Sequence, residues 1–120
     1  MNQYPPNWAE TARAVKDAAG WRCIRCGAAH SREGWRILTV HHFDGDKSNC
    51  AWWNLMALCQ RCHLSVQGRV DPHVPWLFEH THWMKPFAAG FYAKKYLSMD
   101  LTREQVEARL EELLGLERVA

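Results

Sequence analysis

The sequence contains no apolar run that approaches the roughly 18 residues needed to cross a bilayer. Its first residues, Met1 to Pro6, lack the basic and then apolar pattern of a secretory signal. Internal repeats and low-complexity segments are also lacking. These absences argue against a membrane-spanning protein, and they predict an intracellular, cytoplasmic protein with no membrane partner.

The sequence also has little net charge, at +2, so it is not a polycation that would coat nucleic acid without discrimination. Hydrophobic residues make up 48% of the 120 residues, which predicts one globular domain over 1–120. The basic excess is local. Residues 1–69 hold nine Lys or Arg against five Asp or Glu, whereas residues 70–120 hold six against eight. A phosphate-contacting surface is therefore expected in the first part.

Four of the five cysteines form two matched pairs, Cys23-x-x-Cys26 and Cys59-x-x-Cys62. In a reducing compartment such pairs more often bind metal than form disulfides, and this spacing lets four thiolates hold one tetrahedral Zn²⁺ at about 2.3 Å. The alternatives are unliganded buried cysteines or two disulfides. The remaining Cys50 is interpreted as a small buried apolar residue without a role.

The gap between the two cysteine pairs is 32 residues, longer than the usual zinc-finger separation of about 15 to 20. A substantial structural element must therefore lie between the pairs. Turn residues and β-formers within it predict a strand over 35–40 that runs into His41 and His42, a loop over 43–49 and a short strand or turn over 55–58.

Helices are expected on both sides of this hairpin. The patterns predict one over about 8–19, capped by Asn7 with Glu10 and ended by Gly20, and another from Cys59 to about Gly68. Residues 71–120 form a C-terminal extension with an irregular stretch over 71–83. Thr102 and Gln105 predict a capping box that opens an amphipathic helix over about 102–114.

The stretch from Thr39 to Asn49, followed by Asn54 to His63, resembles the signature of the HNH endonuclease family in its zinc-bound variant. The resemblance spans about residues 23–66, roughly half of the chain. It implies an α+β fold: a small ββα-metal (His-Me finger) core over about 21–70 with structural zinc, flanked by N- and C-terminal helices. It also implies a phosphodiester hydrolase that cuts DNA and leaves a 5′-phosphate and a 3′-hydroxyl, similar to products of phage and bacterial genomes.

Carried over residue by residue, the resemblance assigns His42 as the general base and Asn54 as the residue that holds the loop. His41 and His63 would bind the catalytic divalent metal. The family often has an aspartate where this chain has His41, a variation that favours the softer Mn²⁺, Zn²⁺ or Ni²⁺ without excluding Mg²⁺. A neutral imidazole with an ordinary pKa of about 6.5 is suited to accept a proton from water at physiological pH.

Adjacent residues on a regular strand point to opposite faces, so His41 and His42 cannot both serve one site from an undistorted strand. We therefore expect the strand to end or bulge at this pair. Because the pair lies between two cysteine knuckles with Asn54 and His63 behind it, a catalytic role is favoured over a structural one.

Other residues carry weaker expectations. Lys47, Arg61 and Arg69 flank the expected site as candidates for phosphate contacts, with solvated charge as an equal competitor. The C-terminal helix is expected to pack on the core, with a protein partner or a dimer contact as the alternative. Turn, surface or core roles are expected for Asp44, Asp46, Asn49, the histidines at 80 and 82, and the tryptophans at 52, 53, 76 and 83.

Two further function classes compete with the nuclease hypothesis. The first is a catalytically inactive, zinc-stabilised module that binds nucleic acid, and the second is an interaction or scaffold protein. A nuclease needs the His42 base, whereas the binding module needs only the zinc-held fold and the basic surface. DNA binding at low salt separates both from a scaffold.

Overall fold

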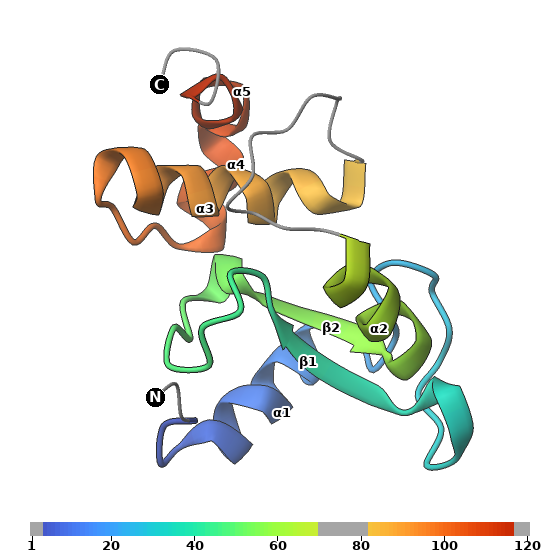
Figure 1. The fold of residues 1–120 in the computed structure, drawn as a ribbon. Helices are drawn as coiled ribbons and strands as arrows, with labels where there is room; N and C mark the ends of the chain where they lie inside the picture. The colour runs from blue at the N-terminus through green and yellow to red at the C-terminus, as the bar shows by residue number, and fades with distance from the viewer. Residues whose placement is uncertain (1–3, 70–81, 117–120) are drawn as a thin grey trace.

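The computed structural model describes residues 4–69 and 82–116, with the side chains of 67–69 left out of the description. The fold is α+β: an antiparallel hairpin of β1 (Leu38–His42) and β2 (Leu55–Cys59) followed directly by helix α2 (Gln60–Arg69). Helix α1 (Trp8–Ala18) precedes the hairpin. Helices α3 (Lys85–Leu97), α4 (Arg103–Ala108) and α5 (Leu110–Leu114) follow it (Figure 1). Within the described ranges, no helix has the length and apolar character that crossing a membrane requires.

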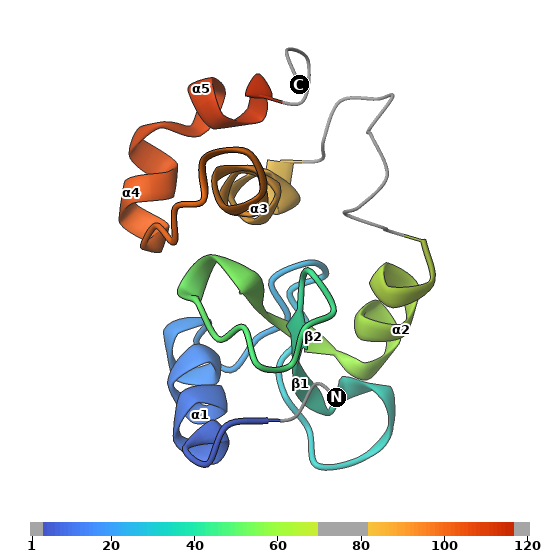
Figure 2. The same cartoon turned by 60° about the vertical axis from the view of Figure 1, so that its left-hand side comes forward.

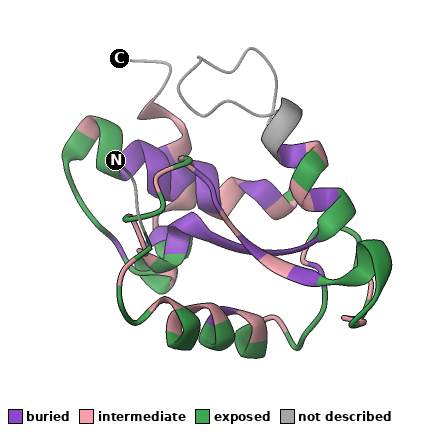
Figure 3. Ribbon diagram, turned by 60° about the horizontal axis from the view of Figure 1, so that its bottom comes forward, coloured by how far each residue is buried: buried purple, intermediate pink, exposed green. Residues whose placement is uncertain are grey.

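The hairpin lies between α1 and α2, and both helices contact both strands (Figure 2). Pairing runs without a bulge from Leu38 opposite Cys59 to His42 opposite Leu55. All of β2 is buried, whereas β1 alternates between buried and half-buried residues. The buried positions run along the strands and the helix beside them in Figure 3. The hairpin is therefore covered on both faces.

The strand predicted over 35–40 is wrong at its start, because residues Gly34–Arg36 form a 3-10 turn, η1, and β1 begins at Leu38. Gly34 has a φ of +70°, and its carbonyl accepts from the Ile37 N–H at 3.4 Å. This local turn replaces strand geometry although Trp35 and Ile37 are β-formers.

Helix α1 has nearly the predicted bounds, but the predicted Asn7 side-chain cap is wrong. The Asn7 side chain makes no cap hydrogen bond; instead its backbone carbonyl accepts from the Thr11 N–H at 3.1 Å and from the Thr11 hydroxyl at 3.3 Å. The chain leaves the helix through Gly20, whose φ of +65° is in the left-handed region.

Helix α3 was not predicted, since its sequence has no amphipathic period. Seven consecutive residues, 87–93, are buried, so the apolar side chains lie on every side of the helix. Gly90 lies directly against Trp53: a Cβ atom there would lie 2.5 Å from the Trp53 Cβ. This close contact fixes the 3-10 turn η2 (Trp52–Asn54), and with it Asn54, against α3.

The capping box predicted at Thr102 is present. The Thr102 hydroxyl accepts from the Gln105 N–H at 3.2 Å, and Gln105 Oε1 accepts from the Thr102 N–H at 2.9 Å. The single helix predicted over 102–114 is instead broken at Arg109 into α4 and α5. Val106 and Leu113 are both fully buried, and α5 packs against α3. The break lets both short helices bury their apolar residues within the chain.

Candidate metal centre and histidine cluster

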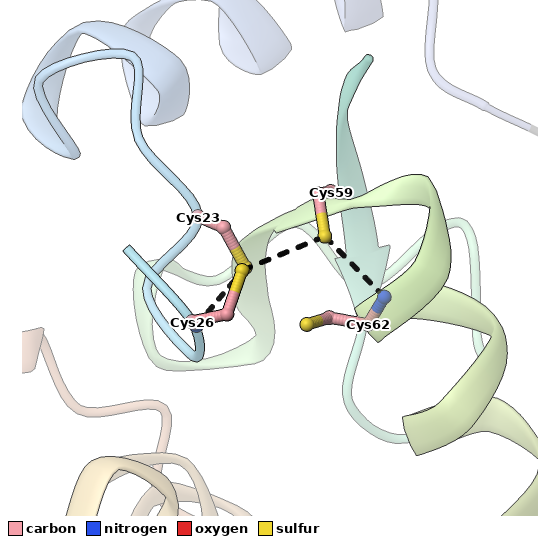
Figure 4. Close-up of side chains that lie close together, drawn as sticks. All are labelled: Cys23, Cys26, Cys59 and Cys62. Atoms are coloured by element: carbon pink, nitrogen blue, oxygen red, sulfur yellow. Dashed lines mark hydrogen bonds between the residues drawn. The ribbon is translucent and has the colours of Figure 1, made fainter. Parts of the chain in front are cut away.

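The four paired cysteines converge at one point, with their sulfur atoms all within 4.8 Å of one another (Figure 4). Cys23 and Cys26 lie on the loop after α1, Cys59 is the last residue of β2, and Cys62 lies in the first turn of α2. The Cys26 and Cys59 sulfurs are 3.8 Å apart. A tetrahedral ion with Zn–S bonds of about 2.3 Å places its sulfur ligands about 3.8 Å apart. The cluster is therefore consistent with a structural zinc site.

The electrostatics of the cluster also suit a bound cation. Burial raises the pKa of the Cys62 thiol to about 12, although the Arg25 guanidinium donates to its sulfur at 3.4 Å. Burial also acts to raise the pKa of Cys23, but backbone N–H groups, including that of Cys26, lower it to about 7. The Cys23 thiolate thus forms readily near neutral pH, and the Cys62 thiol ionises when a bound cation compensates its charge.

The cysteine cluster joins the loop after α1, the end of β2 and the start of α2, the helix that carries His63. The Ile24 N–H donates to the Ala57 carbonyl of β2 at 3.0 Å, so the first knuckle is bonded to the hairpin. His63 follows Cys62 directly. An ion held by the four sulfurs would therefore fix where α2 starts relative to β1. Cys50 lies outside this cluster and is half-buried, not buried as expected.

His41 on β1 and His63 on α2 lie side by side, with ring centroids 4.7 Å apart. Both side chains are half-buried. Burial and the charges of His63 and His42 lower the pKa of His41 to about 4, and burial lowers the pKa of His63. Both rings are therefore neutral near pH 7, the state in which imidazole binds a metal ion.

The His63 ring is also bonded to β1 through Thr39, a residue not singled out from the sequence. The Thr39 Oγ1 atom lies 2.8 Å from His63 Nδ1 and 2.8 Å from the Leu58 carbonyl oxygen. Thr39 and His41 are two positions apart on β1 and thus share the face towards α2. That alternation is the sequence signal that could have identified Thr39.

His42 is the last residue of β1, so the strand ends at the histidine pair, as one of the two expected outcomes. The register stays regular, however, and the two side chains take opposite faces. The His42 ring stacks on Trp8 of α1 at 4.9 Å, and Trp8 stacks on Tyr4 at 4.8 Å. His42 is only 5% exposed as a result. Neither aromatic residue was anticipated as a neighbour of His42.

The charge environment links His42 to the other histidines and to the following loop. Burial lowers the pKa of His42, the carboxylates of Asp44 and Asp46 oppose this effect, and the charges of Lys47 and His63 add to it. Its Nε2 atom lies 3.9 Å from the Cys50 sulfur. The imidazole is therefore neutral near pH 7, as a proton acceptor must be.

Asn54 is fully buried and holds the loop between the strands at three points. Its Oδ1 accepts from the Asp44 N–H at 2.9 Å, and its Nδ2 donates to Asp44 Oδ1 at 2.9 Å and to the Asn49 carbonyl at 2.8 Å. Its backbone carbonyl accepts from the Phe43 N–H at 2.8 Å. These bonds fix the chain immediately after His42. Asp44 and Asn49 take part as turn acceptors and donors within the loop.

Two of the three candidates for phosphate contacts are exposed and lie over aromatic rings. Lys47 is exposed, with its Nζ 5.1 Å from the centre of the Tyr4 ring. Arg61 is exposed and its guanidinium lies 4.2 Å from the centre of the Trp35 ring. Arg69 ends α2, but its side chain lies outside the described part. The remaining tryptophans and histidines for which core or surface roles were expected differ in burial. Trp53 is buried, Trp83 is half-buried, Trp52 and His82 are exposed, and Trp76 and His80 lie outside the described residues.

Comparison with known proteins shows a distant relationship to part of a bacterial protein. The chain is 33% identical over 60 residues to the Zorya protein ZorE of Escherichia coli (strain Crooks). The matched segment is 50% of this chain but 16% of ZorE, so the chain corresponds to a small part of that protein. No family model matches the chain, and no solved structure matches it.

Proposed function

We propose that this chain is a metal-dependent DNA endonuclease of the HNH type, with a ββα-metal core held by a structural zinc ion. The observation that carries the proposal is the pairing of the His41 and His63 rings beside a four-cysteine cluster, on a hairpin followed directly by a helix. The distant similarity to ZorE, a bacterial protein, agrees with the bacterial or phage origin expected from the sequence.

The catalytic ion would be held by His41 and His63, whose neutral rings fit a divalent cation such as Mn²⁺, Zn²⁺ or Ni²⁺. Two imidazoles leave most coordination positions open. In the described part of the chain, the cysteine cluster is the group that brings three or more possible metal ligands together, whereas His41 and His63 form a pair of ligands. A bound ion supplies stabilisation of the charge that develops on the phosphate and on the departing oxygen.

The other residues supply proton transfer and geometry. His42 accepts the proton of the attacking water, because its ring is neutral and the contact of its Nε2 with the Cys50 sulfur, at 3.9 Å, is a weak one. Asn54 holds the loop that follows His42, and so keeps the base in place relative to the ligand pair. Lys47, Arg61 and Arg69 are the proposed contacts to the DNA backbone.

A second candidate function is a zinc-stabilised module that binds nucleic acid without cutting it. The observation that favours it is the burial of His42 under Trp8, because a base that is 5% exposed gives a water molecule little access. In that case the aromatic stack of Tyr4, Trp8 and His42 would serve packing alone.

A plasmid cleavage assay separates the two candidates. We expect zinc-loaded protein to convert supercoiled plasmid to nicked or linear DNA when Mn²⁺ or Mg²⁺ is added, and to stop when the added ion is chelated. Binding to the same plasmid at low salt should be measured in parallel. DNA binding without cleavage in Mn²⁺, Mg²⁺, Ni²⁺ and added Zn²⁺ would overturn the nuclease proposal in favour of the binding module.

A further inference from the structure

The Thr39 hydroxyl lies between two hydrogen-bonding atoms from different elements. Its Oγ1 atom is 2.8 Å from the Leu58 carbonyl oxygen on β2 and 2.8 Å from His63 Nδ1 on α2. A threonine hydroxyl has one hydrogen to donate and lone pairs to accept with. A carbonyl oxygen can only accept. The hydroxyl hydrogen must therefore go to Leu58 if both short contacts are hydrogen bonds.

This assignment decides which nitrogen of His63 carries the proton. With its own hydrogen directed to Leu58, Thr39 can only accept from the ring, so His63 Nδ1 must be the N–H donor. If Nδ1 were unprotonated, two acceptors would compete for one hydrogen at 2.8 Å. A neutral imidazole protonated at Nδ1 has its lone pair at Nε2, which is free for a metal ion.

We propose that Thr39 is a positioning residue that fixes His63 in the Nδ1–H tautomer and so presents its Nε2 lone pair to the divalent ion. The inference rests on the proposed function for the ion, but the tautomer stands on the hydrogen bonds alone. A metal-binding histidine is usually oriented by its ring N–H, on the nitrogen that does not bind the metal, which donates to a protein acceptor.

The same residue connects the structural metal site to the proposed catalytic one. Leu58, which accepts the Thr39 hydroxyl, directly precedes Cys59, and His63 directly follows Cys62. Thr39 lies on the strand that carries His41, two residues away on the same face. The Thr39 hydroxyl therefore orients the His63 ring beside His41. It does so through the Leu58 carbonyl, whose backbone position the adjacent cysteine cluster holds.

The test is a comparison of Thr39→Val, which keeps the shape without the hydroxyl, with Thr39→Ser, which keeps the hydroxyl. Mn²⁺ affinity of the zinc-loaded protein should be measured by calorimetry, because Mn²⁺ does not compete well for thiolates. We expect Thr39→Val to bind Mn²⁺ about 10- to 100-fold more weakly, and Thr39→Ser to keep the parent affinity. Thr102→Val is the matched control, since it removes a hydroxyl that caps α4 and lies outside the histidine cluster.

The tautomer is tested in the unmodified, zinc-loaded protein by the imidazole ¹⁵N chemical shifts of His63. We expect protonated Nδ1 and unprotonated Nε2, and the opposite pattern would overturn the proposal even if Thr39→Val failed to fold. Equal Mn²⁺ affinity in the parent protein and in Thr39→Val would also overturn it. If the parent protein has the Nδ1–H tautomer but binds none of Mn²⁺, Mg²⁺, Ni²⁺ and added Zn²⁺, the proposed nuclease function fails and so does the metal-directed role of Thr39.

Discussion

Replacing His42 by alanine should remove divalent-ion-dependent nicking of plasmid DNA. The loss is expected to be on the order of 10²- to 10⁴-fold, the contribution of a positioned general base. DNA affinity and zinc content should change little, because the four cysteines that form the metal cluster do not include this residue. The measurement is the rate of nicking in Mn²⁺ at saturating protein, together with plasmid binding at low salt.

Two controls keep that result interpretable. His42 is buried against Trp8, so its removal also leaves space in the structure. His42→Asn keeps a polar side chain there without the basicity of imidazole, and it should lose activity equally while melting close to the parent protein. His82→Ala removes an exposed histidine and should retain activity. Nicking by His42→Asn at the parent rate would contradict the assigned role of His42 as base.

Loss of the zinc ligands should have the largest effect on stability. Zinc binding in isolated zinc-finger peptides is worth about 10 to 16 kcal/mol at neutral pH, and most of that is folding free energy. Here the cluster joins the loop after α1, the end of β2 and the start of α2. We expect Cys62→Ala to contain less than one zinc per chain and to melt at least on the order of 10 °C lower, since roughly 3 kcal/mol has that effect in a domain of this size.

Cys50→Ala is the matched control for the zinc prediction. Cys50 is half-buried and lies outside the four-sulfur cluster, so its removal should leave one zinc per chain. Elemental analysis after extensive dialysis, followed by thermal unfolding with and without chelator, measures both effects. A parent protein that is free of zinc yet melts at the same temperature with and without chelator would contradict the structural role.

The sequence predicted the hairpin and its neighbouring helices because the signals there are local. Paired Cys-x-x-Cys spacing fixes ligand geometry over three residues, and the four sulfurs do converge. Runs of β-formers and turn residues place strands and loops between the pairs. Thr102 and Gln105 form the predicted capping box for the same reason, since both residues lie within one helical turn.

The features that the sequence did not predict depend on contacts between distant parts of the chain. Residues 87–93 of helix α3 are all buried, and α3 packs against η2 and α5, so it lacks the single apolar stripe from which a helix is recognised. The stacking of Trp8 on His42 joins positions 34 residues apart, and no local pattern encodes it. Asn7 could form a cap by residue type, but its backbone geometry does not present the side chain to the helix.

The proposed catalytic site also depends on contacts between distant parts of the chain. The packing of α2 on β1 determines which residues lie beside His63. From the sequence, His41 and His63 were predicted as a ligand pair only through the family resemblance. The structure brings these two rings together and leaves His42 on the other face of the strand. The proposed role of each histidine therefore depends on whether an ion binds between His41 and His63.

The most direct test is to count the ions that bind to zinc-loaded protein. Calorimetric titration with Mn²⁺ should show one further ion per chain in the parent protein and in His42→Ala, and none in His63→Ala. Absence of a second ion in the parent protein, or undiminished binding in His63→Ala, would contradict the account.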